Sequence, residues 1–249
     1  MGAEPGSLER FRERQRQLIE RLRSGGVRDL AVLQAFDQVP RHLFVPEVFW
    51  ARAYADEALP IGRGQTISRP STHALYLEAL ELRGRERLLE IGAGSGFQTA
   101  LLAVLCEHVY AIERVAELAA AARNRIESLG FTNVAIRVGD GAYGWRAYAP
   151  FDAIIVTAGA REVPKPLIQQ LSPGGRLLIP IGDSESQDLH RFTRAAGAGG
   201  EGGEGGEGGK GGKGGEGETL VDEVIAKVRF VALRGRAGLE GFSESISRR

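Results

Sequence analysis

The stretch LLEIGAGSGFQTA (Leu88–Ala100) places glycines at positions 92, 94 and 96 between an apolar run and a helical pattern. Glycine lets a backbone turn tightly and approach a ligand, beside the free N–H groups at the start of the following helix. A dinucleotide-binding loop requires a small residue at position 97, where this chain has Phe97. No Gly-Lys-Ser/Thr sequence follows, so the stretch does not match a phosphate-binding P-loop either.

The residues after this loop alternate between short apolar runs and helical stretches. Runs rich in Ile, Val and Leu are typical of parallel strands that are buried on both faces of a sheet. Strands that alternate with helices at this spacing predict an α/β fold with a doubly wound, mostly parallel sheet. The expected strands are Arg87–Gly92, His108–Glu113, Val134–Asp140, Phe151–Ala158 and Gly175–Gly182, and the expected helices are Phe97–Cys106, Val115–Gly130 and Pro164–Ser172.

Acidic residues stand at or near the ends of the first three expected strands. Glu113 ends the second, where a carboxylate can accept hydrogen bonds from both ribose hydroxyls, each contributing roughly 1.5–3 kcal/mol. Asp140 closes the third and can accept from an adenine amino group, while Glu90 can hold the glycine loop or meet a cationic cofactor. Each acid alone is also compatible with a solvated strand end or a helix cap. Because open α/β sheets bind ligands at this edge, the set predicts an adenosine without a pyrophosphate, which S-adenosylmethionine fits best.

The segment before the core is expected to be largely helical. Apolar positions at helical spacing predict two helices within residues 8–33. The proline-bounded segment Val39–Pro46 predicts an irregular stretch followed by a short helix. A further helix is expected to begin near Pro70, with Ser68 or Ser71 as its cap.

Two strand-like segments and a glycine-rich tract follow Gly182. Leu189–Ala195 and Thr219–Gly235 are expected to be antiparallel edge strands. The tract between them cannot form a core and lacks the proline that collagen needs, so it predicts a disordered loop. We expect one structural domain, comprising an N-terminal helical segment with the substrate loop (1–82), the cofactor-binding α/β core (83–196), the glycine-rich loop (197–218) and a closing strand with a tail (219–249).

Composition limits the class of protein further. The chain has 32 basic and 32 acidic residues, so no global field draws it to nucleic acid or to an anionic membrane. Its single cysteine, Cys106, suits a reducing compartment and falls on an apolar run typical of a core. No apolar run is long enough for a membrane helix, and the N-terminus lacks the apolar region of a signal peptide. These features predict a soluble cytoplasmic protein, and the scattered histidines predict no metal site.

The sequence also constrains the methyl acceptor. After the fourth core strand, VTAGAREVP (Val156–Pro164) lacks the Pro-Pro-aromatic pattern that is common in amino-group methylation, and none of the four histidines is a strong candidate for a base. A carboxylate acceptor is already ionised near neutral pH and needs positioning and desolvation rather than proton transfer. The stretch GQTIS offers Gln65, Thr66 and Ser68 to hold such a carboxylate without protonating it.

Six pieces of the chain resemble the protein-L-isoaspartate O-methyltransferase family, which methylates the abnormal carboxyl formed when Asn deamidates or Asp isomerises. The pieces are VPRHLFVP, YADEALPIGRGQTIS, LLEIGAGSGFQTALLA, VGDGAYGW, FDAIIVTAGAREVP and LSPGGRLLIPIG, in order over most of Val39–Gly182. The segment VIAKVRFVALRG resembles the closing strand of the family. The resemblance implies a class I methyltransferase fold, S-adenosylmethionine as donor, S-adenosylhomocysteine as product and isoaspartyl-containing proteins and peptides as substrates.

The resemblance also implies roles for individual residues. Ser68 matches the active-site serine of the family, and we expect it to bind and orient the substrate carboxylate rather than to attack it. Thr157 and Ala158 are expected to line the transfer pocket, with Val163–Pro164 on its substrate side. The expected cofactor-binding residues are Glu90, Gly92, Ala93, Gly94, Ser95, Gly96, Gln98, Glu113, Arg114, Asp140, Gly141 and Thr157.

Two alternative functions stay open from the residues alone. The first is an S-adenosylmethionine-dependent methyltransferase that acts on a small molecule. The second is a non-catalytic module that recognises damaged proteins and recruits partners, with the glycine-rich tract as a tether. We expect the chain to act as a monomer that binds neither nucleic acid nor membrane.

Overall fold

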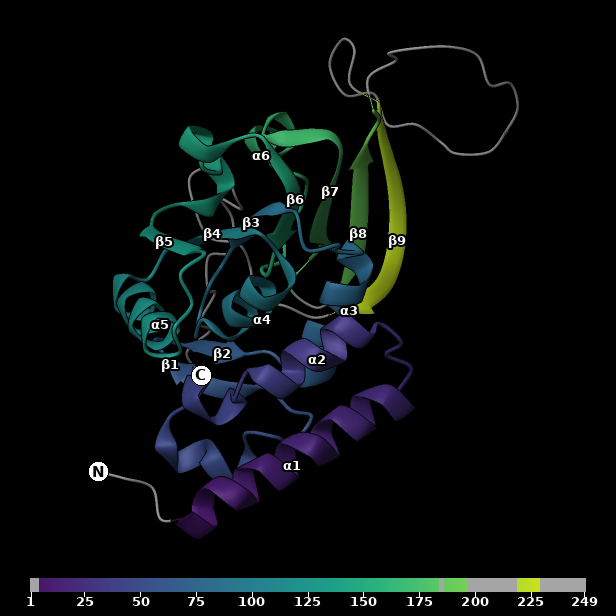
Figure 1. Ribbon diagram of the computed structural model, residues 1–249. Coiled ribbons are helices and arrows are strands. Elements are labelled where there is room, and N and C mark those ends of the chain that lie inside the picture. Colours follow the sequence, from purple (N-terminus) through teal and green to yellow (C-terminus); the bar gives the residue numbers. More distant parts are fainter. Residues whose placement is uncertain (1–4, 184–185, 197–218, 229–249) are drawn as a thin grey trace, which may run out of the picture.

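The computed structural model describes residues 5–183, 186–196 and 219–228. The glycine-rich tract 197–218 and the part of the expected closing strand beyond Val228 lie outside the described residues, so the predictions for them stay predictions. A central sheet is covered by helices, and a further layer of N-terminal helices packs on one side (Figure 1).

Seven strands form this sheet, in the order β5-β4-β3-β6-β7-β8-β9. The first five in this order pair in parallel, and β8 runs antiparallel to both of its neighbours. The predicted α/β class and the antiparallel strands at the end of the sheet are thereby confirmed. The strands are β3 (Arg87–Ile91), β4 (His108–Glu113), β5 (Val134–Val138), β6 (Phe151–Val156), β7 (Leu171–Gly182), β8 (Gln187–Arg194) and β9 (Leu220–Val228).

Both faces of the central strands are buried, but different elements cover them. Alternate residues of a strand point to opposite faces, and Leu88 and Leu89 accordingly belong to two separate apolar clusters. The second cluster packs on the short helix α6 (Lys165–Gln169) and on the segment that carries Trp145. The first cluster contains residues of the helices α1 (Pro5–Ser24), α2 (Leu30–Gln38), α3 (Pro70–Leu80), α4 (Phe97–Leu105) and α5 (Ala116–Ser128).

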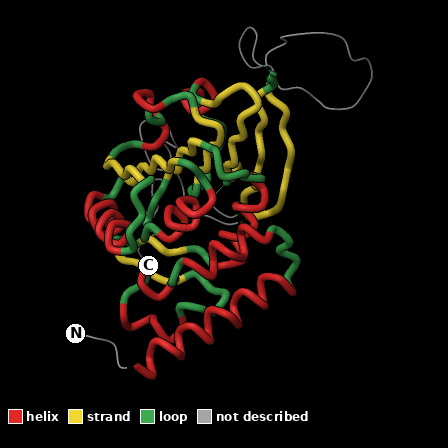
Figure 2. Tube along the Cα trace, viewed as in Figure 1, coloured by secondary structure: helices red, strands yellow, loops and turns green. Residues whose placement is uncertain are grey.

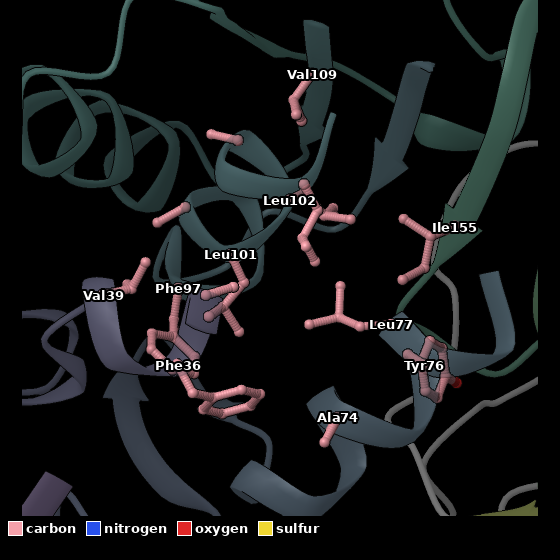
Figure 3. Close-up of a cluster of buried hydrophobic side chains, with 14 of the residues drawn as sticks. Phe36, Val39, Ala74, Tyr76, Leu77, Phe97, Leu101, Leu102, Val109 and Ile155 are labelled. Atoms are coloured by element: carbon pink, nitrogen blue, oxygen red, sulfur yellow. The ribbon is translucent and has the colours of Figure 1, made fainter. Parts of the chain in front are cut away.

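The first cluster fixes the start of α4, which follows the glycine loop directly. Phe97, the first residue of α4, is 1 % exposed and contacts Phe36 of α2 edge to face, with ring centroids 5.9 Å apart. Figure 3 shows Phe36, Phe97 and Leu101 gathered beside Leu77 of α3. The N-terminal helices therefore hold the cofactor-binding core and the segment before α3 in one packed unit.

The segment between α2 and α3 differs from its prediction in detail. The expected irregular stretch and short helix are two 3₁₀ helices, η1 (Arg41–Phe44) and η2 (Glu47–Arg52). The polar loop around Gly64 contains a two-stranded antiparallel hairpin, β1 (Leu59–Gly62) and β2 (Gln65–Ile67), which is separate from the large sheet (Figure 2). The hairpin is too short and too polar for its strands to be predicted from the periodicity of apolar residues.

The predicted cap of α3 is wrong. The residue at the N-cap position is Arg69, and neither Ser68 nor Ser71 caps the helix with its side chain. Instead Asp56, from the segment before β1, accepts a hydrogen bond from the backbone N–H of Ser71 at 2.8 Å. A carboxylate from a distant segment thus satisfies the free N–H group that a local serine was expected to satisfy.

In the described ranges no helix is long and apolar enough to cross a membrane. Within the same ranges no group of His, Cys, Asp or Glu side chains is arranged to hold a metal ion.

Candidate active site

The glycine loop leaves β3 at the switch point of the sheet, where β4 lies on one side of β3 and β6 on the other. Gly92, Gly94 and Gly96 have φ angles of 96°, 54° and 87°, in the left-handed region that other residues rarely adopt. A Cβ at Gly92 would also overlap the hydroxyl of Thr157. The predicted tight glycine turn between a strand and a helix is therefore confirmed.

Glu113, the last residue of β4, holds the glycine loop in place. Its Oε2 accepts a hydrogen bond from Gly94 N at 2.8 Å, and its Oε1 accepts one from Val115 N at 2.9 Å. A carboxylate oxygen has two lone pairs, so both oxygens can accept a further hydrogen bond. Glu113 can consequently organise the loop and still bind two hydroxyls of a ligand.

Asp140 follows β5 and caps the 3₁₀ turn η3 (Gly141–Tyr143), accepting a hydrogen bond from Ala142 N at 3.0 Å. The next residue, Gly141, lies so close to β3 that a Cβ there would overlap the side chain of Ile91. The turn that carries Asp140 is therefore pressed against the strand that leads into the glycine loop. This packing brings the ends of β3 and β5 together across β4.

Thr157 follows β6 and completes the same edge of the sheet. Its hydroxyl lies 3.0 Å from the carbonyl oxygen of Ile91 and 2.9 Å from that of Gly92. Its backbone N–H donates to the same carbonyl of Ile91 at 3.0 Å. Thr157 thus ties the end of β6 to the glycine loop, and the predicted site residues of four adjacent strands meet at one place.

Glu90, in contrast, is sealed inside the protein. It is 0 % exposed, Oε2 accepts a hydrogen bond from Thr99 Oγ1 at 2.6 Å, and Oε1 has no hydrogen-bond partner among the described residues. Burial, with a smaller contribution from the charge of Glu113, raises the pKa of Glu90 to about 8, although the hydrogen bond from Thr99 opposes the rise. Without a ligand, Glu90 is therefore largely protonated at neutral pH.

Glu90→Gln is expected to make the protein less sensitive to rising pH. The folded-state pKa of Glu90 is above its unfolded value, so its contribution to stability is complete below about pH 4.5 and is lost as pH rises through about 8. Between about pH 5 and about pH 8 the loss is on the order of 4 kcal/mol. In thermal unfolding without cofactor, the melting temperature of Glu90→Gln minus that of the wild type should therefore increase as pH rises over this range. Glu107→Gln, at an exposed position, is the control. A difference in melting temperature between Glu90→Gln and the wild type that stays constant with pH contradicts a neutral Glu90.

The other expected cofactor residues fall into two groups. Ala93, Ser95 and Gln98 are buried, at 4 % exposed each. Ser95 shapes the loop, because its hydroxyl accepts from Phe97 N at 3.3 Å and its carbonyl accepts from Arg125 at 3.2 Å. Arg114 is exposed beyond the end of β4.

The β1–β2 hairpin carries the predicted catalytic residues. Thr66 is exposed, whereas Ile67 is buried and pairs across the hairpin with Leu59. Because strand side chains alternate, Gln65 points to the side of Ile67 and Thr66 to the opposite side. The structure therefore does not bring Gln65 and Thr66 to one face. Ser68 follows β2 and is half-buried. Its side chain does not cap α3, because Asp56 accepts the hydrogen bond from the first turn of that helix.

His73 connects α4 with the segment that carries Ser68, and the sequence argument passed over it. This α3 residue is 8 % exposed, and its Nδ1 donates a hydrogen bond to Oε1 of Gln98 on α4. Burial, together with the charge of Arg41, lowers the pKa of His73 to about 3, while bonds with Gln98 and with the backbone of Ser68 oppose the change. A neutral His73 thus contacts both the cofactor-side helix and the serine segment.

Arg41 is the second residue that the sequence argument missed. It is 1 % exposed, and its guanidinium donates to the carbonyl oxygens of Ala53 at 2.7 Å and Glu57 at 3.1 Å. The same group lies over the ring of Phe97, 5.3 Å from its centroid. Arg41 therefore fixes the segment that bears Asp56 against the first residue of α4. Only the position of Arg41 inside the proline-bounded segment hinted at a buried role.

The buried histidines are unsuited to base catalysis. Burial lowers the pKa of His42 to about 4, and its Nδ1 is bonded to the hydroxyl of Tyr54 at 2.8 Å. His73 has a pKa of about 3 and is held by Gln98. The lowered pKa values make both imidazoles weak bases, which agrees with the expectation of an acceptor that is already ionised.

The site has the parts that an adenosine with a short charged tail requires. Glu113 ends β4, Asp140 follows the neighbouring strand β5, and Gln98 Nε2 is a buried donor without a partner in the described chain. This fold with this site defines a class I S-adenosylmethionine-dependent methyltransferase. The sequence model of the protein-L-isoaspartate(D-aspartate) O-methyltransferase family matches residues 13–201. The chain belongs to this family.

Individual relatives agree with this assignment. A protein-L-isoaspartate O-methyltransferase of Syntrophus aciditrophicus is 52 % identical over 188 residues, covering 75 % of this chain and 86 % of the relative. One from Dictyoglomus thermophilum is 42 % identical over 228 residues, covering 92 % and 94 %. A solved protein-L-isoaspartate O-methyltransferase has a TM-score of 0.73 at 28 % identity, over 90 % of this chain and 67 % of its own. A Plasmodium falciparum beta-aspartate methyltransferase, solved with S-adenosyl-L-homocysteine, has a TM-score of 0.68 at 27 % identity over 88 % and 97 %.

The predicted family, fold class and cofactor are therefore confirmed. The chain is an S-adenosylmethionine-dependent protein carboxyl methyltransferase whose substrates are proteins that contain isoaspartate. Methylation of the isoaspartyl α-carboxyl gives an ester that closes to a succinimide, and hydrolysis of the succinimide returns some normal aspartate.

Proposed function

We propose that the glycine-loop edge of the sheet and the hairpin-to-α3 segment are the cofactor half and the substrate half of one repair centre. Bound S-adenosylmethionine supplies a methyl group that is activated by a sulfonium. In the cofactor half, Glu113 accepts from the ribose hydroxyls, Asp140 faces the adenine amino group, and the glycine loop leaves room for close approach. Gln98, whose Nε2 lacks a partner within the described chain, orients the polar tail of the cofactor.

The substrate half acts by orientation. Ser68 donates its hydroxyl to the isoaspartyl α-carboxylate and holds one oxygen toward the methyl group, with Thr66 on the same side of the chain. A carboxylate needs no base, and the lowered pKa values of His42 and His73 support a mechanism without one. The rate enhancement then comes from alignment and from removal of water around the two reactants.

The observation that carries this proposal is the contact chain between the two halves. Gln98 on α4 binds His73 on α3, and His73 contacts the backbone of Ser68. The serine segment is therefore held in a fixed relation to the helix that begins at the glycine loop. Such fixed geometry is what an in-line transfer between two bound groups requires.

Two peptides of one sequence test the assignment, one with L-isoaspartate and the other with L-aspartate. Incubation with methyl-labelled S-adenosylmethionine is expected to leave base-labile label on the isoaspartyl peptide alone, because only that carboxyl is presented at the correct distance from the backbone. Label on both peptides contradicts the proposed selectivity. Label on neither, with cofactor binding intact, favours a small-molecule acceptor or a recruitment role.

The organisation of the protein follows from the same arrangement. We propose that residues 1–82 and 83–196 are parts of one domain, because the site is built from both. Every proposed site residue comes from one chain, so a single copy is complete and a monomer suffices. The single buried cysteine fits the reducing cytoplasm.

A further inference from the structure

An ion pair joins the hairpin to the far side of the cofactor crevice. Arg63 at the hairpin tip and Glu117 in the first turn of α5 are 2.9 Å apart, Nη2 to Oε1. Both side chains are 60 % exposed. Figure 1 shows β1 and β2 beside α5.

The backbone at this tip adopts an unusual conformation. Gly62, Arg63 and Gly64 have φ angles of 93°, 54° and 68°. Arg63 is one of two non-glycine residues with positive φ in the described part of the chain, a conformation that L residues rarely adopt. A glycine or asparagine would fit the turn with less strain. The geometry of the turn therefore does not explain an arginine at position 63.

The hairpin lies over the glycine loop. Ile61 of β1 is close enough that its Cδ1 would be 3.6 Å from a Cβ on Gly94. Gly94 is the residue whose N–H is held by Glu113. The hairpin therefore extends from the serine segment, across the middle glycine, to the start of α5, and the ion pair fastens its free end.

We propose that Arg63 and Glu117 form a latch that keeps the hairpin closed over bound S-adenosylmethionine and slows its release. The inference rests on the proposed cofactor site and extends it. Because Gln65, Thr66 and Ser68 continue from the same hairpin, closing the latch also brings the substrate half over the cofactor. Arg63 and Glu117 are positioning residues, since neither is expected to touch the reacting atoms.

Charge reversal tests the latch with little change in backbone preference. The variants Arg63→Glu and Glu117→Arg each place like charges at the tip, and the double variant restores an opposite pair. Release is followed by chasing bound, labelled S-adenosylmethionine with unlabelled cofactor, so that no methyl transfer enters the measurement. We expect each single variant to release the cofactor about three- to tenfold faster, as for an exposed pair converted to a repulsive one, and the double variant to return within about twofold of wild type.

Salt and a remote variant separate the latch from general effects. Raising the ionic strength from about 0.05 M to about 0.5 M should speed release from wild type and slow it from the single variants, because screening weakens attraction and repulsion alike. Arg16→Glu reverses one charge of a comparable exposed pair with Glu13 on α1 and should leave release unchanged.

Each outcome has a distinct meaning. Equal release rates for all variants, or a double variant that stays as fast as the singles, overturn the latch. If wild type binds cofactor and labels the isoaspartyl peptide, that failure leaves the proposed function intact. If wild type fails to bind S-adenosylmethionine at all, the cofactor site itself is wrong.

Discussion

Glu113→Ala is expected to raise the dissociation constant of S-adenosylhomocysteine, the cofactor product with the same ribose, about 100-fold or more. The alanine removes the carboxylate that is proposed to accept hydrogen bonds from two ribose hydroxyls. Each hydrogen bond to such a charged acceptor contributes roughly 1.5–3 kcal/mol to binding. It also releases Gly94 N and Val115 N, which the carboxylate now holds at 2.8 and 2.9 Å. The glycine loop therefore loses its fixed shape as well as a direct ligand contact. Calorimetric titration of each variant with S-adenosylhomocysteine measures the effect.

The matched variants separate these two causes. Glu113→Gln keeps one acceptor oxygen but turns an amide NH₂ toward a backbone N–H or a hydroxyl, so an intermediate loss of affinity is expected. Glu127→Ala removes an exposed carboxylate from α5 and should leave affinity within about twofold. A folded Glu113→Ala variant that binds S-adenosylhomocysteine as tightly as wild type would refute the ribose role.

The sheet and its ligand edge could be predicted because their signals are local. A buried strand such as β6 contains a run of apolar residues, Ala153–Val156. The glycines of the loop at Gly92–Gly96 indicate a tight turn, because their positive φ angles suit glycine. Once the strands alternate with helices, the fold rules place Glu113 and Asp140 at one edge without further information. Each of these inferences needs only a few neighbouring residues.

The contacts that join the two halves of the site could not be predicted in that way. Ser68 beside Pro70 has the local pattern of a cap, yet Asp56 fills that role from another segment. His73 and Arg41 look like ordinary residues of a helix and a loop. Their importance comes from packing against Gln98 and Phe97, which lie far along the chain.

The sequence of the hairpin predicted candidate residues but not the face on which each side chain lies. Its polar sequence identified Gln65, Thr66 and Ser68 as candidate carboxylate ligands, but a strand alternates its side chains. Only the pairing of Ile67 with Leu59 reveals which face is buried. Gln65 therefore lies on the face of the buried Ile67, whereas Thr66 lies on the exposed face.

Ser68→Ala is expected to lower kcat on an isoaspartyl peptide about 10- to 100-fold and to leave the affinity for S-adenosylhomocysteine unchanged. The hydroxyl is proposed to bond a charged carboxylate, a contact that contributes roughly 1.5–3 kcal/mol. Because Ser68 does not cap α3, the substitution should cost little stability. Initial rates at saturating cofactor and peptide, with thermal unfolding alongside, measure both effects.

Two further variants decide whether the loss belongs to substrate orientation. Ser71→Ala removes a nearby serine hydroxyl on α3 and should keep kcat within about twofold, since only the backbone N–H of Ser71 is held by Asp56. Asp140→Ala should show the reverse of Ser68→Ala, with cofactor affinity reduced about tenfold and kcat at saturating cofactor nearly retained. If Ser68→Ala and Asp140→Ala have the same small effect on both quantities, the division of the site into a substrate half and a cofactor half fails. If Ser68→Ala instead weakens cofactor binding and spares kcat, the serine belongs to the cofactor half, because a residue that orients the acceptor cannot leave turnover unchanged.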